Sequence, residues 1–327
     1  VLFFIVAIVK KTEIKFLFKT TIFIIFVAFS VYFSLATFQL TQYEGTIHFY
    51  GVMGSDQSYF GIKNPPRSSG IARLSLVIFA FLYLYFLINH KDKKNKLFLS
   101  FIGFFALTTI VPQSRTVSFI FLIINFLIIF FYYKEIIKNK IIILFVLIAP
   151  LMINFSYDLF QKVNYKNEEK ITVNLKKLNS QDVLRSAKNS VLRQQNYDNL
   201  NNFTSGRLEN WKTTLNKIKT NPLKGYGSQA DRIYINQSMH NAFLYSWLSG
   251  GILGAVFILG CYLKGLNFFV KFFVSKNLRK NLFYSASLFI LIIIYMRSLL
   301  ETSFAIYSID YLIFIVSIYY LKYSVKE

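Results

Sequence analysis

Long runs of apolar residues separated by short polar gaps make up most of the chain, apart from one polar stretch at 158–240. Runs of about 20 residues match the length that an α-helix needs to cross a hydrocarbon core of about 30 Å. Backbone polar groups find no water in that core, so spanning segments must be helices or closed barrels. Continuous apolar runs, without the two-residue alternation of a barrel strand, predict helices. We therefore expect an all-α fold, a polytopic membrane helical bundle.

The apolar runs also predict how the chain is organised. Complete spans are expected at residues 16–39, 72–88, 97–112, 117–133, 141–157, 241–263, 282–296 and 304–322. The shorter run at 1–9 is interpreted as the end of a truncated helix, which makes about nine spans. This pattern predicts N-terminal transmembrane helices at 1–157, a large loop at 158–240 and C-terminal transmembrane helices at 241–327. Glycines 250, 251 and 254 are expected to allow close helix packing.

Positive charge decides the expected orientation. The net charge is +22, and in a soluble protein it would suggest nucleic acid, but here the hydrophobic content is 54% and the lysines cluster in alternate gaps. The clusters are Lys10, Lys11 and Lys15; Lys91, Lys93, Lys94 and Lys96; Lys134, Lys138 and Lys140; Lys271, Lys276, Arg279 and Lys280; and Lys322 and Lys326. The positive-inside rule assigns these gaps to the cytoplasm. The remaining gaps are therefore expected to face outward: 40–71, 113–116, 158–240 and 297–303. Because the positive charge is explained by this orientation, we expect no nucleic-acid partner.

The long outward loop is too long for a simple connection, so it should carry structure of its own. Residues 180–194 can form one helix, and a second should begin with Ser205 as its N-cap. The second helix should end before Pro222, because the residue before a proline avoids the helical region. Its apolar positions recur at intervals of three and four: Leu208, Trp211, Leu215 and Ile218.

Two outward arginines are candidates for binding an anion. Arg207 lies in the first turn of the predicted loop helix, where unpaired N–H groups and the helix dipole favour negative charge. Arg115 lies in the short turn at 113–116, on the side where the positive-inside rule disfavours arginine. The alternatives are an ordinary exposed side chain for Arg207 and an interfacial one for Arg115.

Further polar residues lie at the outward ends of the C-terminal spans. Arg297 and Glu301 are four residues apart, a spacing that suits a helical ion pair as well as a substrate contact, and Asp310 is near enough to join them. His240 opens the span at 241–263, and an unperturbed imidazole titrates near pH 6.5, so it can accept a proton at neutral pH. The alternative for His240 is an interfacial side chain without chemistry.

The sequence contains no pattern for a metal or a nucleotide. The three histidines are scattered, and Cys261 is the single cysteine, so no pair has the spacing of metal ligands. Neither a P-loop nor a dinucleotide fingerprint occurs. We therefore expect neither a metal nor a cofactor.

Several of these residues fall in a recognisable order. The chain contains Thr-Ser-Gly-Arg-Leu-Glu-Asn-Trp at 204–211, Asn-Pro-Leu-Lys-Gly-Tyr-Gly at 221–227, and His240-Asn241 followed by Gly-Ile-Leu-Gly at 251–254. This order resembles the O-antigen ligase and polymerase superfamily of bacterial envelopes, and Ser114-Arg115 is similar to an arginine turn of that family. The resemblance is clear over 204–254 and diffuse from 64 to 204, and the last two spans with Arg297 and Glu301 also look similar.

The resemblance implies a function and roles. Such proteins transfer a glycan from an undecaprenyl-diphosphate carrier to an acceptor hydroxyl at the periplasmic face of the inner membrane. The acceptor is a lipid A-core sugar in ligases and another lipid-linked repeat unit in polymerases. Carried onto this chain, the resemblance implies that Arg207 and Arg115 hold the diphosphate and that His240 removes the acceptor proton, with inversion at the sugar. The residues expected to bind substrate are Arg297, Glu301, Arg67, Arg73 and Asn241.

Other functions stay open at this point. We favour a polymerase or an unspecified member of the family over a lipid A-core ligase, because nothing in the sequence suggests a contact with that core. A flippase or transporter for the same lipid-linked sugars would place charges in the middle of several spans, whereas here they gather at the outer edge, apart from Lys19 and Asp310 near span ends. A membrane protein with a purely structural role is the remaining alternative.

Overall fold

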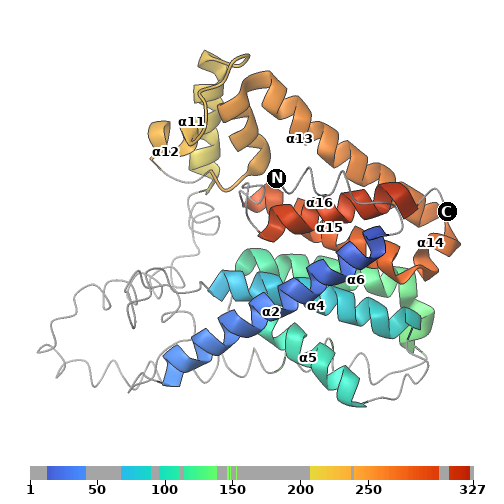
Figure 1. Cartoon of the computed structure of the whole chain (residues 1–327). Helices are drawn as coiled ribbons and strands as arrows, with labels where there is room; N and C mark the ends of the chain where they lie inside the picture. The colour runs from blue at the N-terminus through green and yellow to red at the C-terminus, as the bar shows by residue number, and fades with distance from the viewer. Residues whose placement is uncertain are drawn as a thin grey trace, which may run out of the picture. The chain divides into compact units, whose positions relative to one another are not determined.

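The computed structural model describes residues 13–41, 68–89, 96–110, 114–137, 207–236, 239–301 and 309–324, and the single residues 146, 148 and 152. Within these ranges the regular structure is helical (Figure 1). The helices are α2 (Ile14–Thr41), α4 (Ser68–Asn89), α5 (Lys96–Ile110), α6 (Arg115–Ile137), α11 (Arg207–Thr220), α12 (Ala230–Tyr234), α13 (Ala242–Val274), α14 (Lys276–Lys280), α15 (Leu282–Leu300) and α16 (Ile309–Ser324).

The fold class predicted from the sequence is confirmed. Among the described residues, five helical stretches are long and apolar enough to cross a membrane: Ile14–Leu35, Gly70–Ile88, Thr116–Ile137, Ala242–Val274 and Leu282–Leu300. Leu97–Ile110 is a shorter apolar helix. The protein is thus an all-α, multi-pass membrane protein. Three segments expected from the sequence lie outside the described residues, apart from the single positions 146, 148 and 152. They are the apolar runs at 1–9 and 141–157 and the helix at 180–194.

The ends of several helices differ from the predicted bounds. Helix α13 continues past residue 263 to Val274, and α15 continues past 296 to Leu300. Arg115 is the first residue of α6, although it was expected in a turn. The predicted ends followed the fall in hydropathy, but lysine is a good helix former, so α13 continues through Lys264 and Lys271.

The chain divides into two compact units. One unit comprises residues 1–24 and 197–327. In it α15 packs against both α13 and α16, and α11 and α12 pack against α13. The start of α2 joins this unit through Phe18, whose ring centroid lies 6.1 Å from that of Phe283 and 5.6 Å from that of Tyr320.

The second unit comprises residues 25–196. Here α4 packs against α5 and α6, with the rings of Phe79 and Phe121 in contact at 5.0 Å between centroids. Ser75 lies fully buried on α4 and donates its hydroxyl hydrogen to the carbonyl of Phe105 on α5 at 2.8 Å. Such interhelical hydrogen bonds join helices in a bilayer, where the hydrophobic effect gives no drive for their association.

Helix α11 packs through only part of the predicted apolar stripe. Its buried residues are Thr214 and Ile218, with Trp211 packed partly buried beside Ile218, whereas Leu208 and Leu215 are exposed. The buried positions follow the helical spacing of three and four, and the two leucines lie on one flank of that face. The predicted N-cap Ser205 lies outside the described residues, and the helix ends at Thr220, before Pro222 as predicted.

A break in α13 receives the segment at 221–227. Gly251 has φ 61° and ψ −152°, a conformation open essentially to glycine alone, and it interrupts the helical hydrogen bonds. Backbone groups of the segment replace the lost partners: Tyr226 N donates to Leu248 O at 2.8 Å, Gly227 N to Ser249 O at 2.9 Å, and Ile252 N to Leu223 O at 3.2 Å. The break is therefore satisfied within the protein, as it must be near a bilayer.

Glycine is required on both sides of this contact. A Cβ atom at Gly251 would collide with the carbonyl of Leu223, and one at Gly225 would collide with the backbone at Ser249 and Gly251. Gly225 also has a positive φ of 72°. The sequence predicted close helix packing for Gly251, but the close approach is between a broken helix and a turn. This contact fixes α11 against the first part of α13, where the candidate site begins.

Candidate functional site

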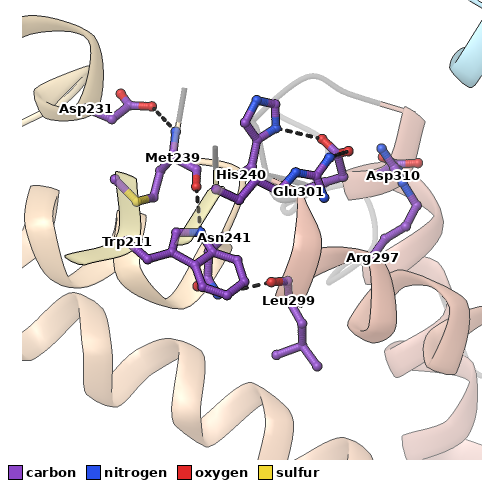
Figure 2. A network of polar contacts seen from close by, with 10 residues as sticks. Trp211, Asp231, Met239, His240, Asn241, Arg297, Leu299, Glu301 and Asp310 are labelled. Atoms are coloured by element: carbon purple, nitrogen blue, oxygen red, sulfur yellow. Dashed lines mark hydrogen bonds and ion pairs between the residues drawn. The ribbon is translucent and has the colours of Figure 1, made fainter. Parts of the chain in front are cut away.

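Three predicted site residues come together where helices begin or end. Arg207 is the first residue of α11, His240 directly precedes Asn241, the N-cap of α13, and Glu301 is the C-cap of α15. Figure 2 shows the imidazole of His240 facing the carboxylate of Glu301. Residues that lie 94 and 61 positions away from Glu301 in the sequence thus share one carboxylate.

The carboxylate of Glu301 bridges a cation and an imidazole. Its Oε1 accepts a hydrogen bond from Nη2 of Arg207 at 3.0 Å, and its Oε2 lies 3.1 Å from Nδ1 of His240. The three side chains are 22% (Arg207), 38% (His240) and 28% (Glu301) exposed. The cluster is therefore partly desolvated but still open to a ligand.

The surroundings keep Glu301 ionised. Burial alone would raise the pKa of this carboxyl group, but the hydrogen bond with His240 and the charges of Arg207, His240 and Arg297 outweigh burial and lower the pKa below its usual value. An ionised carboxylate only accepts hydrogen bonds. Nδ1 of His240 must therefore carry a hydrogen, and in the neutral imidazole Nε2 is then the acceptor.

The backbone at His240 is unusual. His240 has φ 50°, in the left-handed region that few residues other than glycine adopt, although histidine is among those enriched there. Such a conformation costs about 1–3 kcal/mol and persists when neighbouring contacts impose it. It marks the point at which the chain leaves the α11–α12 region and enters α13.

Asn241 fixes the start of α13 on the end of α15. Its side-chain oxygen accepts from the backbone N of Leu244 at 2.9 Å, which is an N-cap interaction, and its amide nitrogen donates to the carbonyl of Leu299 at 3.0 Å. The second bond holds His240 and Glu301 at neighbouring helix ends. Asn241, expected to bind substrate, thus uses both ends of its side chain within the protein.

Arg297 forms its ion pair with Asp310 and not with Glu301, the partner that the four-residue spacing suggested. Glu301 has φ −147° and ψ 158°, so the backbone is extended there and the four-residue helical spacing no longer joins the two side chains. Nη1 of Arg297 instead makes a short hydrogen-bonded ion pair with Oδ2 of Asp310, and the two side chains are 12% and 6% exposed. This pair joins the end of α15 to the start of α16.

The comparison with protein families covers part of this cluster. Residues 100–259 match a family model described as O-antigen ligase. This segment of the chain is therefore similar to the O-antigen ligase family. The similarity supports a glycan-transferring activity of the O-antigen ligase or polymerase type, with lipid-linked glycan substrates in a membrane. No curated protein and no solved structure matches the chain.

The matched segment contains only part of the candidate site. Arg115, Arg207 and His240 lie within the residues that match the O-antigen ligase family, whereas Glu301 and Asp310 lie after them. The carboxylate that joins Arg207 to His240 is thus supplied from outside the matched segment. Its pairing depends on where α15 ends and on the packing of α15 against α13, which sequence spacing alone does not give.

The other predicted residues belong to the unit of residues 25–196 or lie outside the description. Arg115 begins α6, and Arg73 lies half-buried near the start of α4. Arg67 lies outside the described residues. Among the described residues, no group of three or more His, Cys, Asp or Glu side chains is arranged to hold a metal ion.

Two residues of the site network were not predicted as such. Asp231, almost fully buried, and Trp211 both hold Met239, the residue before His240. Trp211 was noted for its apolar spacing and as the last residue of the segment at 204–211, without a role at the site, and Asp231 occurs in no recognisable pattern. The one available signal was an acidic residue nine positions before a candidate histidine, which is too common to interpret.

Proposed function

We propose that this protein, which is similar to O-antigen ligases over residues 100–259, transfers a glycan from an undecaprenyl-diphosphate carrier to a sugar hydroxyl at the periplasmic face of a bacterial inner membrane. The observation that carries the proposal is the Glu301 carboxylate, which holds an arginine on one oxygen and a histidine on the other. One cluster thus combines a base for the acceptor with a cation for the diphosphate.

His240 acts on the acceptor. With its Nδ1 hydrogen directed at Glu301, the lone pair on Nε2 can take the proton of a sugar hydroxyl. The hydroxyl oxygen then attacks the anomeric carbon, and the bond from that carbon to the phosphate oxygen breaks. Direct attack from the opposite face inverts the configuration. The resulting imidazolium lies beside the ionised Glu301, which stabilises its charge.

Arg207 acts on the leaving group. The electron pair of the broken bond remains on undecaprenyl diphosphate, so negative charge grows there, and a nearby guanidinium stabilises it. Arg207 begins α11, where the helix dipole favours an anion as well. A guanidinium has five N–H donors, so one side chain can hold Glu301 and phosphate oxygens together. Arg115, at the first residue of α6, is proposed as a second cation for the diphosphate.

The distribution of charge favours this function over a flippase. A transporter of lipid-linked sugars would need charged groups buried in the middle of its spans. In the described part of the chain the buried charged side chains are Asp231 and Asp310. Asp231 lies in the short helix α12, and Asp310 is the second residue of α16.

A reconstituted reaction tests the proposal. The full chain is placed in liposomes with a defined undecaprenyl-diphosphate oligosaccharide, and both lengthened lipid-linked glycan and glycan on added lipid A-core are measured. Product on the lipid-linked acceptor identifies a polymerase, and product on lipid A-core identifies a ligase. We expect His240→Ala and His240→Gln to abolish transfer, because neither side chain can accept the proton, while the donor still binds. Transfer by His240→Ala at the wild-type rate would remove the histidine from this role.

A further inference from the structure

Met239, the residue before His240, is held from three sides. It is fully buried, its backbone N donates to Oδ2 of Asp231 at 3.1 Å, and its carbonyl accepts from Nε1 of Trp211 at 3.0 Å (Figure 2). Its sulfur lies 3.2 Å from the hydroxyl oxygen of Thr214. The donor and the acceptor of one residue are thus fixed by side chains from α12 and α11.

Asp231 makes this clamp from within the short helix α12. Its Oδ1 accepts from the backbone N of Arg232 at 2.9 Å while Oδ2 accepts from Met239, and the residue is only 4% exposed. A buried carboxylate is costly unless hydrogen bonds satisfy it. Two backbone N–H groups do so here, and each is held in return by a charge-assisted hydrogen bond, which is stronger than a neutral one.

The clamp lies directly against the unusual backbone of His240. On one side Met239 is fixed by Asp231 and Trp211, and on the other Asn241 is fixed as the N-cap of α13 and by its bond to Leu299. Between these two fixed residues His240 takes its positive φ of 50°. The direction of the imidazole therefore depends on the orientation of the Met239 peptide.

We propose that Asp231 is a positioning residue, which fixes Met239 so that His240 presents Nδ1 to Glu301 and Nε2 to the reacting hydroxyl. The catalytic part of this inference rests on the proposed function, whereas the orientation of the imidazole does not. Asp231 touches neither His240 nor Glu301 through a contact given by the structure, so it acts through the Met239 backbone. Trp211 holds the next peptide group, the one that joins Met239 to His240, through the carbonyl of Met239.

The experiment reads the histidine itself. The full chain is labelled with ¹⁵N-histidine and placed in lipid nanodiscs, where ring ¹⁵N shifts distinguish the Nδ1–H from the Nε2–H tautomer. The chain has three histidines, and the signal of His240 is assigned by its loss in His240→Gln. We expect the Nδ1–H tautomer in the wild type and a mixture in Asp231→Asn, whose amide offers one acceptor oxygen for two N–H groups. The signals of His48 and His90 should not change.

Kinetics add a second readout. We expect kcat of Asp231→Asn to fall by about 10- to 100-fold, the size of effect that a displacement of about 1 Å can cause at a reacting group. The KM for the lipid-linked donor should stay within about twofold, since the arginines hold the donor. Trp211→Phe keeps the ring but loses the hydrogen bond to Met239, so it should change the tautomer and kcat in the same direction even if Asp231→Asn fails to fold.

Matched controls separate positioning from general damage. Glu209→Gln removes an exposed acid from α11 and should alter neither readout, and Thr214→Val should have a small effect because it acts on the side chain of Met239 and not on its backbone. A wild-type tautomer and a wild-type kcat in both Asp231→Asn and Trp211→Phe would overturn the inference. If His240→Ala retained transfer, the proposed role of His240 as the base would fail, yet the tautomer would still decide the role of Asp231.

Discussion

Nδ1 of His240 lies 3.1 Å from Oε2 of Glu301, although the two residues are 61 positions apart in the sequence. The contact joins the start of α13 to the end of α15, and Asn241 holds these two helix ends together through Leu299. A histidine whose Nδ1 is bound to an ionised carboxylate has one tautomer and one direction, which are the two properties that a general base needs.

Glu301→Gln should therefore impair the reaction while preserving the fold. The amide can accept from Arg207 or His240 but carries no charge, so it no longer fixes the tautomer or stabilises the imidazolium. We expect kcat to fall by about 10²-fold or more, as tautomer loss does in other histidine–carboxylate pairs. Transfer from the defined donor in liposomes measures the effect, with Glu209→Gln as the matched exposed control. A kcat within threefold of wild type would show that the carboxylate is dispensable.

Stability should depend on Glu301 in acid. The pKa of this carboxyl group is lowered in the folded protein, despite burial, by His240 and Arg207. Its stabilisation is therefore fully present above the ordinary value of 4.5 and is lost as the pH falls through the lower folded pKa. We expect the Tm difference between wild type and Glu301→Gln to shrink from pH 6 to pH 3. A difference that stays constant across this range would contradict the prediction.

The fold was largely predictable because a bilayer requires each spanning segment to be a continuous apolar helix. Helices such as α4 and α15 must be continuous and apolar, and both properties can be read locally. Helix ends were less predictable, because α13 continues through lysines after the hydropathy has fallen. Helix propensity, which favours lysine, determines the helix end there.

Three members of the candidate cluster could be selected from the sequence, but their pairing could not. Arg207, His240 and Glu301 were identified from helix position, titration range and outward placement, and the structure brings these three together. Their pairing depends on the extended backbone at Glu301, which turns its side chain away from Arg297 and toward residues far away in the sequence. Asp231 could not be found in the same way, because its contribution passes through a backbone N–H group that any residue could supply.

The buried pair of Arg297 and Asp310 should respond differently to single and double substitutions. Removing one member leaves the other charge buried and uncompensated, so Arg297→Met or Asp310→Leu should each destabilise the protein by about 3–5 kcal/mol. The double variant Arg297→Met with Asp310→Leu should recover most of that loss. Thermal unfolding in detergent measures the cycle. Equal Tm values for the single and double variants would mean that the pair is not coupled.

The same double variant decides whether Arg297 binds substrate. Because the pair already satisfies its charge, we expect the stability-restored double variant to bind the lipid-linked donor within about threefold of wild type. Donor binding is measured in nanodiscs, separately from transfer. A stable double variant with strongly weakened donor binding would instead support the substrate contact predicted from the sequence.

The orientation predicted from the lysines has a direct test. In a Cys261→Ser background, Leu200→Cys should react with a membrane-impermeant thiol reagent added outside intact cells, and Lys93→Cys should react only after the membrane is opened. The first position lies in the long loop and the second in a lysine-rich gap, on opposite sides by the positive-inside rule. The reverse labelling pattern would place His240 on the cytoplasmic side and would overturn the periplasmic reaction.

Arg207→Lys separates charge from geometry at the diphosphate. Lysine keeps one positive charge, but its ammonium is a compact group that cannot present two parallel N–H donors to an anion. Arg207 already contacts Glu301 through Nη2, so an ammonium in its place would have to serve the carboxylate and the diphosphate from one point. We expect the affinity for the lipid-linked donor to fall by about 10- to 100-fold, with normal membrane insertion and an unchanged His240 tautomer, because Glu301 stays ionised beside a cation.

Arg115→Lys should weaken donor binding in the same direction if it is the second cation. Arg232→Lys, an exposed arginine of α12, is the matched control and should bind donor as wild type does. Full donor affinity in both Arg207→Lys and Arg115→Lys would leave the arginines a general electrostatic role and would remove the bidentate contact from the mechanism.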